Sequence, residues 1–110
     1  MKSPIIVALD MESKRALELA KKLNPQECKV KVGSQLFTAD GPIIIEKLNE
    51  LGFDIFLDLK FHDIPNTVKK AVETVIKMGV WMLNVHSLGG KEMLRAANEV
   101  VEKASIKPLL

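Results

Sequence analysis

Polar side chains, most of them charged, stand at the carboxyl ends of four apolar runs in this sequence. Asp10 follows Ile-Ile-Val-Ala-Leu, Lys31 lies in Lys-Val-Lys-Val, Asp58 and Lys60 end an apolar run, and His86 follows Trp-Met-Leu-Asn-Val. An ammonium group held beside carboxylates can stabilise developing negative charge and then deliver a proton. The residue types therefore indicate acid–base or charge-stabilising chemistry.

The spacing of these residues predicts that they meet. If the apolar runs are strands, alternate side chains along each run point to the same face. Asp58 and Lys60 then share one face, while Ile55 and its alternate neighbours face covering helices, and the same alternation turns Lys31 and Asp10 toward a common centre. We expect Asp58, Lys60 and Lys31 to form one charged cluster. The alternative is that each is a solvated charge at a strand end.

The apolar runs recur regularly along the chain. They start near Ile5, Lys29, Asp54 and Trp81, at spacings of roughly 24 to 27 residues. Between them, apolar residues recur at helical spacing and give each segment one apolar stripe. The stripes are Ala16, Leu17, Ala20 and Leu23; Ile44, Leu48 and Leu51; Val68, Val72 and Val75; and Met93, Leu94, Ala97, Val100 and Val101. The chain therefore contains four strand–helix units, and residues 107–110 begin a fifth strand.

Helix-breaking residues mark the ends of these segments. Asn24-Pro25 closes the first helix, and Asp40-Gly41-Pro42 opens the second with proline in its first turn. Gly52 and Gly79 end the second and third helices. The boundaries agree with the spacing of the apolar runs.

Strands that alternate with single helices predict an α/β fold with parallel strands joined by right-handed crossovers. Either an open doubly wound sheet or a closed eight-fold barrel satisfies this pattern. Short, uniform units favour the TIM (βα)8-barrel, which needs about 250 residues. We therefore expect residues 1–110 to form one domain that is the first half of such a barrel, with its site at the carboxyl ends of the strands.

The composition excludes several classes of protein. The 110 residues carry a net charge of +2, with 47% hydrophobic and 27% charged residues, and the basic residues are spread along the chain. This mix predicts a globular domain with no nucleic-acid or membrane partner. The single cysteine, Cys28, cannot form an internal disulfide, and no signal or membrane segment is present, so we expect a cytoplasmic protein.

The run Asp-Leu-Lys-Phe-His-Asp-Ile-Pro-Asn-Thr, residues 58–67, carries the D-x-K-x-x-D-I-P signature of the orotidine 5'-phosphate decarboxylase family. The sequence also resembles that family at residues 8–10, 31–33, 84–86 and 89–90, which are Ala-Leu-Asp, Lys-Val-Gly, Asn-Val-His and Gly-Gly. The resemblance covers the whole chain. It implies a cofactor-free and metal-free conversion of orotidine 5'-phosphate to uridine 5'-phosphate in pyrimidine biosynthesis, by a homodimer of barrels.

The resemblance also assigns roles to residues. Lys31, Asp58, Lys60 and Asp63 would form a Lys-Asp-Lys-Asp array, in which Lys60 donates a proton to C6 of the pyrimidine and Asp58 lies against the substrate carboxylate. Asp10 and Lys31 would hold the ribose hydroxyls. Asp63 would project into the partner's site. The expected substrate-binding set is Asp10, Lys31, Asp58, Leu59, Lys60, Phe61, His62, Asp63, Ile64, Pro65, Asn66 and Thr67.

Some family features have no counterpart here, and alternatives remain. The phosphate loops after the seventh and eighth strands and the uracil-reading residues after the fifth lie outside the chain, so we expect it to be inactive alone. His86 is expected to support the site by hydrogen bonding, and Gly89-Gly90 to turn the chain. The rivals are a magnesium-dependent sugar-phosphate decarboxylase or synthase of the same superfamily, a Schiff-base aldolase, and a non-enzymatic half-barrel scaffold. The first typically has a carboxylate where Lys31 stands.

Overall fold

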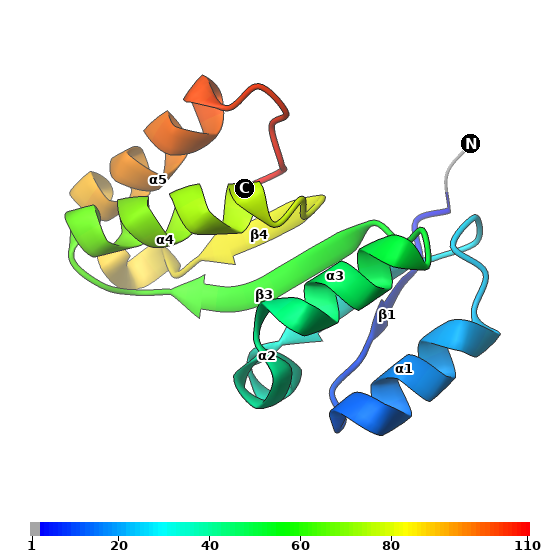
Figure 1. The fold of residues 1–110 in the computed structure, drawn as a ribbon. Coiled ribbons are helices and arrows are strands. Elements are labelled where there is room, and N and C mark those ends of the chain that lie inside the picture. Colours follow the sequence, from blue (N-terminus) through cyan, green and yellow to red (C-terminus); the bar gives the residue numbers. More distant parts are fainter. Residues whose placement is uncertain (1–2) are drawn as a thin grey trace. The chain divides into compact units, whose positions relative to one another are not determined.

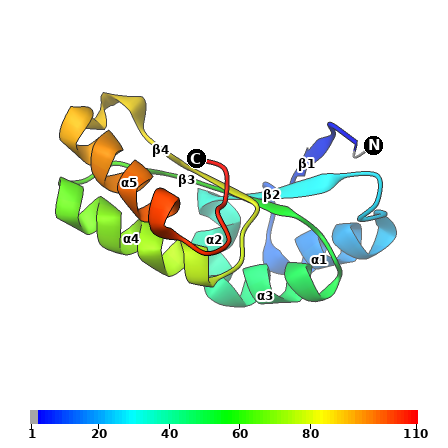
Figure 2. The ribbon, with the colours of Figure 1, turned by 90° about the horizontal axis from the view of Figure 1, so that it is seen from above.

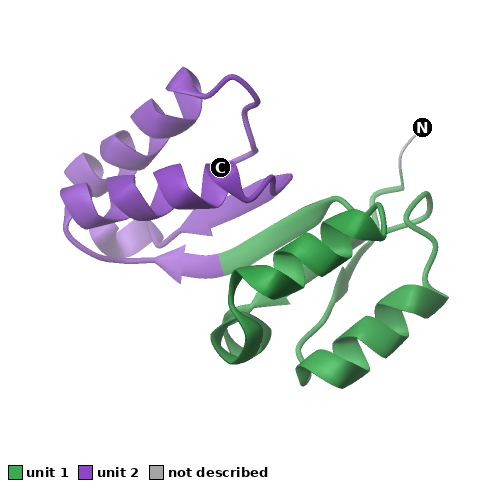
Figure 3. Ribbon diagram, in the orientation of Figure 1, with its two compact units in different colours: residues 1–58 green, residues 59–110 purple. Residues whose placement is uncertain are grey.

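The computed structural model describes residues 3–110, in which four strands take the order β1-β2-β3-β4 (Figures 1 and 2). β1 pairs with β2 and β2 with β3, both in parallel. Helices separate the strands along the chain, as the alternating pattern predicts. Two compact units divide the chain, Met1–Asp58 and Leu59–Leu110, and the boundary falls within β3 (Figure 3).

The first unit contains the first two strands, three helices and the start of the third strand. Its elements are β1 (Ile6–Ala8), α1 (Ser13–Lys22), β2 (Lys29–Gly33), α2 (Ser34–Asp40), α3 (Pro42–Glu50) and the first four residues of β3 (Ile55–Phe61). The register aligns Ala8 with Lys31 and Gly33 with Asp58. Lys31 and Asp58 therefore lie on neighbouring strands of this unit, and Asp10 stands two residues after the end of β1.

Branched aliphatic side chains form the core of the first unit. Val30 and Val32 on β2 and Ile55 and Leu57 on β3 are fully buried. The apolar stripes of the helices supply the remaining core residues, which include Ala16, Ala20, Leu36, Ile44, Ile45 and Leu48. Val30 and Val32 are alternate residues of β2, and Ile55 and Leu57 are alternate residues of β3, so their burial confirms that one face of these strand segments packs into the core.

Helix α2 (Ser34–Asp40) was not predicted from the sequence. It starts directly after β2, and Leu36 is its only fully buried residue. With seven residues it makes only about two turns, which is too short to produce a recognisable stripe of apolar residues. The hydroxyl of Ser13, at the start of α1, donates a hydrogen bond to the Asp40 carboxylate at the end of α2.

The second unit holds the rest of β3 and the last helices. Its further elements are α4 (Pro65–Lys77), β4 (Met82–Val85), the short 3-10 helix η1 (Ser87–Gly89) and α5 (Lys91–Lys103). α4 and α5 lie side by side in both ribbon views (Figures 1 and 2). Most residues of the two predicted stripes are buried here too, namely Val68, Val72, Val75, Met93, Ala97, Val100 and Val101, and Leu83 of β4 joins them in the core. Leu94 was expected in the last stripe but is 37% exposed, because one helical step turns it about 100° away from Met93.

The predicted start of a fifth strand is confirmed. Leu109 forms a parallel bridge with Met82 on β4. The Leu109 amide donates to the Trp81 carbonyl at 2.9 Å, and the Leu83 amide donates to the Leu109 carbonyl at 3.0 Å. The chain therefore re-enters the sheet beside β4 immediately before its last described residue.

The predicted helix ends also agree with the structure. Gly52 and Gly79 have φ angles of 91° and 76°, a left-handed conformation that glycine adopts at low cost just after a helix. α1 ends at Lys22, two residues before Asn24-Pro25. Across residues 3–110, every helix is too short or too polar to traverse a lipid bilayer.

Candidate active site

A partly buried ion pair joins β2 and β3 in the first unit. Lys31 Nζ lies 3.3 Å from Asp58 Oδ2, and the two side chains are 26% and 10% exposed. Asp58 is the only charged residue among residues 3–110 that is buried. A carboxylate withdrawn from water needs partners of opposite charge, and Lys31 supplies one. The Lys31–Asp58 part of the predicted charged cluster is therefore confirmed.

Asp10 lies close to the same strand ends. It follows Leu9, which is fully buried, and the Leu9 amide donates to the Lys31 carbonyl at 2.9 Å. A Cβ atom on Gly33 would stand 3.3 Å from Asp10 Oδ1 and 3.9 Å from the Asp58 carbonyl oxygen. Glycine at position 33 thus lets the Asp10 carboxylate approach the backbone next to Asp58.

A hollow of about 400 Å³ in the second unit gathers the predicted residues that follow Asp58. Its lining consists of Leu59, Lys60, Phe61, His62, Asp63, Thr67, Val68 and Ala71. Six of these belong to the predicted substrate-binding set. Of that set, Ile64, Pro65 and Asn66 are exposed and do not line the hollow.

Lys60 has an unusual backbone conformation. Its φ angle is 51°, and no other non-glycine residue within residues 3–110 has a positive φ. This left-handed conformation costs roughly 1–2 kcal/mol for a residue with a Cβ atom. Regular alternation along β3 therefore stops at Lys60, and strand parity alone does not fix the direction of its side chain. That Lys60 joins Lys31 and Asp58 stays a prediction.

The segment after β3 is shaped by proline. Pro65 stands in the first turn of α4, and Ile64 before it is extended, with φ −61° and ψ 152°. The Ile64 amide donates to the carboxylate of Asp63 at 2.7 Å. Asp63 is exposed at the rim of the hollow, and its role in a partner's site stays a prediction.

His86 makes the supporting hydrogen bonds that we expected. Its amide donates to the Phe61 carbonyl at 2.9 Å, and its Nδ1 accepts from the Leu88 amide at 3.1 Å. Its ring also stacks on the ring of His62, with centroids 4.8 Å apart. His86 therefore holds two neighbouring residues at the end of β3, the backbone of Phe61 and the ring of His62.

Asn84 belongs to the Asn-Val-His motif at residues 84–86, but no role in the site is predicted for it from the sequence. Its Oδ1 accepts a hydrogen bond of 2.9 Å from the Lys60 amide. A polar residue inside an otherwise apolar strand, two positions before His86, was the available signal, because alternate residues of a strand share a face.

Gly89 and Gly90 turn the chain between η1 and α5, as expected. Gly90 has a φ of 92° and precedes the first residue of α5. A Cβ atom on Gly89 would stand 2.1 Å from the sulfur of Met93, which is fully buried. Both glycines therefore have structural reasons to be there.

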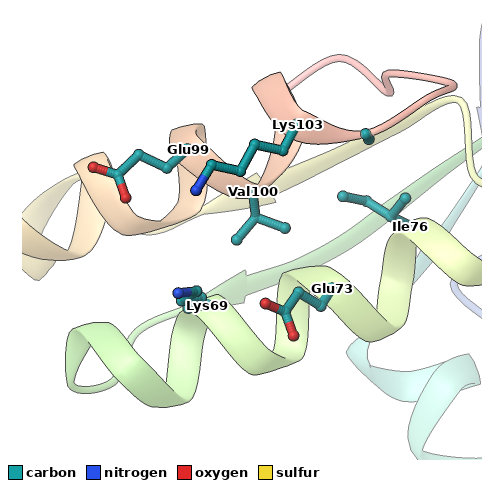
Figure 4. Close-up of a pocket in the computed structure, with 7 residues that line it drawn as sticks. Lys69, Glu73, Ile76, Glu99, Val100 and Lys103 are labelled. Atoms are coloured by element: carbon teal, nitrogen blue, oxygen red, sulfur yellow. The ribbon is translucent and has the colours of Figure 1, made fainter.

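A separate hollow of about 300 Å³ lies between α4 and α5 (Figure 4). Lys69 and Glu73 from α4 and Glu99 and Lys103 from α5 line it together with apolar side chains. It shares no residue with the hollow at Lys60. The part of the chain that the structure describes contains no group of three or more His, Cys, Asp or Glu side chains placed to hold a metal ion.

Parallel strands that alternate with helices, with polar side chains toward their carboxyl ends, are typical of (βα)8-barrels. A family model described as "Orotidine 5'-phosphate decarboxylase / HUMPS family" matches residues 3–110. The chain belongs to this family. Its fold is that of the first four strand–helix units of a TIM barrel, as predicted.

Similar proteins are about twice as long as this chain. The orotidine 5'-phosphate decarboxylase of Dichelobacter nodosus (strain VCS1703A) is 57% identical over 109 residues, which are 98% of this chain and 48% of that protein. The crystal structure of orotidine 5'-phosphate decarboxylase from Lactobacillus acidophilus matches 98% of this chain and 51% of its own, with a TM-score of 0.85 and 38% identity.

A third protein was solved with a bound inhibitor. The orotidine 5'-monophosphate decarboxylase from Methanocaldococcus jannaschii, complexed with inhibitor BMP, has a TM-score of 0.83 and 27% identity. The match covers 94% of this chain and 49% of that one. The chain thus spans about half the length of the relatives that it matches.

Proposed function

We propose that this chain supplies the charged half of an active site that decarboxylates orotidine 5'-phosphate to uridine 5'-phosphate without a cofactor. The observation that carries the proposal is the partly buried Lys31–Asp58 ion pair, because Asp58 opens the D-x-K-x-x-D-I-P signature. Family membership and the relatives' names support the reaction class.

The residue types fit the demands of the reaction. Loss of carbon dioxide leaves a carbanion at C6 of the pyrimidine, with no cofactor to delocalise the charge. The Lys60 ammonium would stabilise that charge as it develops and then protonate C6. Asp58 would stand against the departing carboxylate, and its pairing with Lys31 keeps the charges of the site balanced.

The other predicted residues would bind substrate. Asp10 and Lys31 would hold the ribose hydroxyls, and the segment 58–67 would line the pocket, with Asp63, Ile64 and Thr67 reaching the site of a second subunit. The exposure of residues 62–67 supports such a contact. We therefore propose a cytoplasmic homodimer with shared sites as the working form of the complete enzyme.

The proposed reaction requires binding energy from parts of the substrate that lie away from the reacting carbon. One charged hydrogen bond contributes about 1.5–3 kcal/mol, whereas enzymatic accelerations require about 8–23 kcal/mol. The substrate phosphate is the natural source of the remainder, and barrels commonly bind phosphate after strands seven and eight. The relatives' chains extend beyond the matched half, so those contacts would come from a complementary half.

The test is an assay of orotidylate loss by the purified chain, alone and mixed with the remaining half of the Dichelobacter nodosus relative. We expect negligible turnover alone, recovery on mixing, and loss of the recovered activity in Lys60→Ala. Asn98→Leu, on the exposed face of α5, is the control that should keep the activity. A mixture that assembles but does not decarboxylate orotidylate contradicts the proposal. Rapid turnover by the chain alone contradicts the requirement for the other half.

The same assembly discriminates the rival chemistries. A sugar-phosphate enzyme of this superfamily would need magnesium and would either decarboxylate a keto-gulonate phosphate or make a hexulose phosphate, but Lys31 stands where that branch typically has a carboxylate. An aldolase would be trapped by borohydride at Lys60 in the presence of a carbonyl substrate. We expect neither magnesium dependence nor borohydride trapping.

A further inference from the structure

Lys60 combines an assigned chemical role with a costly backbone conformation. Its φ of 51° lies in the left-handed region, which side chains with a Cβ atom rarely occupy unless the surroundings enforce it. The structure around Lys60 should therefore contain a group that holds this conformation.

We propose that Asn84 is the positioning residue that holds Lys60 in the left-handed conformation. The inference rests on the proposed function, because it gives a purpose to the direction in which the Lys60 side chain leaves β3. Asn84 Oδ1 accepts the Lys60 amide at 2.9 Å. Asn84 thus acts on Lys60 through the backbone.

A second bond, from the residue that directly follows β4, completes the arrangement. The His86 amide donates to the Phe61 carbonyl at 2.9 Å. The two bonds therefore begin at the amide of Lys60 and end at the carbonyl of Phe61, and they come from Asn84 on β4 and from His86, which directly follows β4. Both ends of the Lys60–Phe61 dipeptide are fixed, so the dihedral angles between them have little freedom to relax.

The chemistry of asparagine suits this task. Its amide oxygen is a neutral acceptor on a short side chain, so it reaches a neighbouring strand without adding a negative charge beside the Lys60 ammonium. The β4 residues on either side of Asn84 are Leu83, which is buried in the core, and Val85. Asn84 is therefore the only residue of Met82–Val85 whose side chain offers an oxygen as hydrogen-bond acceptor.

The direct test is amide hydrogen exchange of the 110-residue chain, measured by NMR. Asn84→Leu keeps the approximate size of the side chain but removes the acceptor, and we expect the Lys60 amide to exchange about tenfold faster. Asn84→Asp keeps an acceptor oxygen and should restore slow exchange at Lys60. Asn98→Leu is the matched control, because it makes the same change at an exposed position of α5.

The comparison with other amides separates positioning from general stability. If Asn84 only stabilises the fold, Asn84→Leu will accelerate the protected amides of α4 and α5 as much as that of Lys60. That result, or unchanged exchange at Lys60, overturns the proposal. Selective acceleration at Lys60 supports it.

A glycine at position 60 gives an independent test. Glycine adopts positive φ at little cost, so Lys60→Gly removes the conformational reason for Asn84. We expect the loss in denaturation midpoint caused by Asn84→Leu to be smaller in the Lys60→Gly background. If Asn84→Leu alone does not fold, folding of the double variant supports the proposal and its failure overturns it.

Enzyme kinetics provide a further test of the positioning role, and this test depends on the proposed function. In the mixture with the complementary half, Asn84→Leu should lower kcat for orotidylate with KM unchanged, and Asn84→Asp should recover part of kcat. An inactive wild-type mixture would refute the proposed function alone, because the exchange and denaturation measurements use no substrate. A rise in KM with unchanged kcat would refute the positioning role.

Discussion

The imidazole rings of His62 and His86 stack with centroids 4.8 Å apart and planes inclined by 20°. His62 follows the end of β3 and His86 follows the end of β4. The stack therefore links the segment after β3, which lines the Lys60 hollow, to the segment after β4.

The first prediction concerns this stack. Aromatic pairs contribute about 0.5–1.5 kcal/mol beyond their buried area, so His62→Ala should lower the free energy of unfolding by about 1 kcal/mol. His62→Phe keeps a stacking ring and should lose much less. Urea denaturation of both variants measures the difference, and equal losses would show that the ring contact is not stabilising.

The second prediction concerns the Lys31–Asp58 pair. In a double-mutant cycle with Lys31→Met and Asp58→Asn, the coupling free energy should be about 1.5–3 kcal/mol, the range for a hydrogen bond between charged groups. Because the pair is mostly withdrawn from solvent, salt should weaken the coupling only slightly. The exposed pair Arg95–Glu92 is the matched control, with an expected coupling below about 1 kcal/mol. Equal coupling free energies for the two pairs would contradict the claim that burial strengthens the Lys31–Asp58 interaction.

The third prediction separates stability from binding at Gly33. An alanine methyl group there would meet Asp10 Oδ1 at 3.3 Å, which requires the exposed Asp10 carboxylate to move by a few tenths of an ångström. Gly33→Ala should therefore change the unfolding free energy by less than about 1 kcal/mol. In the mixture with the complementary half, KM should rise because Asp10 is the proposed ribose ligand. An unchanged KM would remove the support for that role.

The fourth prediction concerns Gly89. A Cβ atom there would overlap the sulfur and methyl group of Met93 at 2.1 and 2.2 Å, and Met93 is fully buried. Gly89→Ala should cost about 1–3 kcal/mol because of overpacking. In a Met93→Ala background the same substitution should cost little, since the obstructing atoms are gone. Additive losses in thermal unfolding would show that another contact is responsible.

The strands and most helices could be predicted from the sequence because each has one buried face, which makes apolar residues recur with the period of a strand or a helix. The stripes at Val68, Val72 and Val75 and the alternation at Ile55 and Leu57 mark buried faces, and the structure buries them. Even the residues that begin the fifth strand, with Leu109 beside β4, were evident.

Features without a period were not predictable. Helix α2 is too short to show one, and the left-handed backbone at Lys60 contradicts the strand preference around it. A hydrogen bond from a side chain across strands, such as that of Asn84, depends on the register, which the sequence alone does not give. The Lys31–Asp58 pair could be predicted because the two residues lie on neighbouring parallel strands and strand alternation turns their side chains to the same face.

The backbone at Lys60 has a consequence for the evolution of such sequences. Glycine and asparagine tolerate a positive φ better than lysine does, so substitution by either should make the chain more stable while it removes the proposed proton donor. Selection for stability therefore favours glycine or asparagine at position 60, whereas selection for the proposed proton transfer favours lysine. In a lineage that no longer needs decarboxylation, position 60 should change to glycine or asparagine early. The Lys31–Asp58 pair should change later, because the loss of Lys31 would leave the buried Asp58 carboxylate without this partner. The residue type at position 60 would then distinguish relatives that still decarboxylate orotidylate from relatives that have lost this activity.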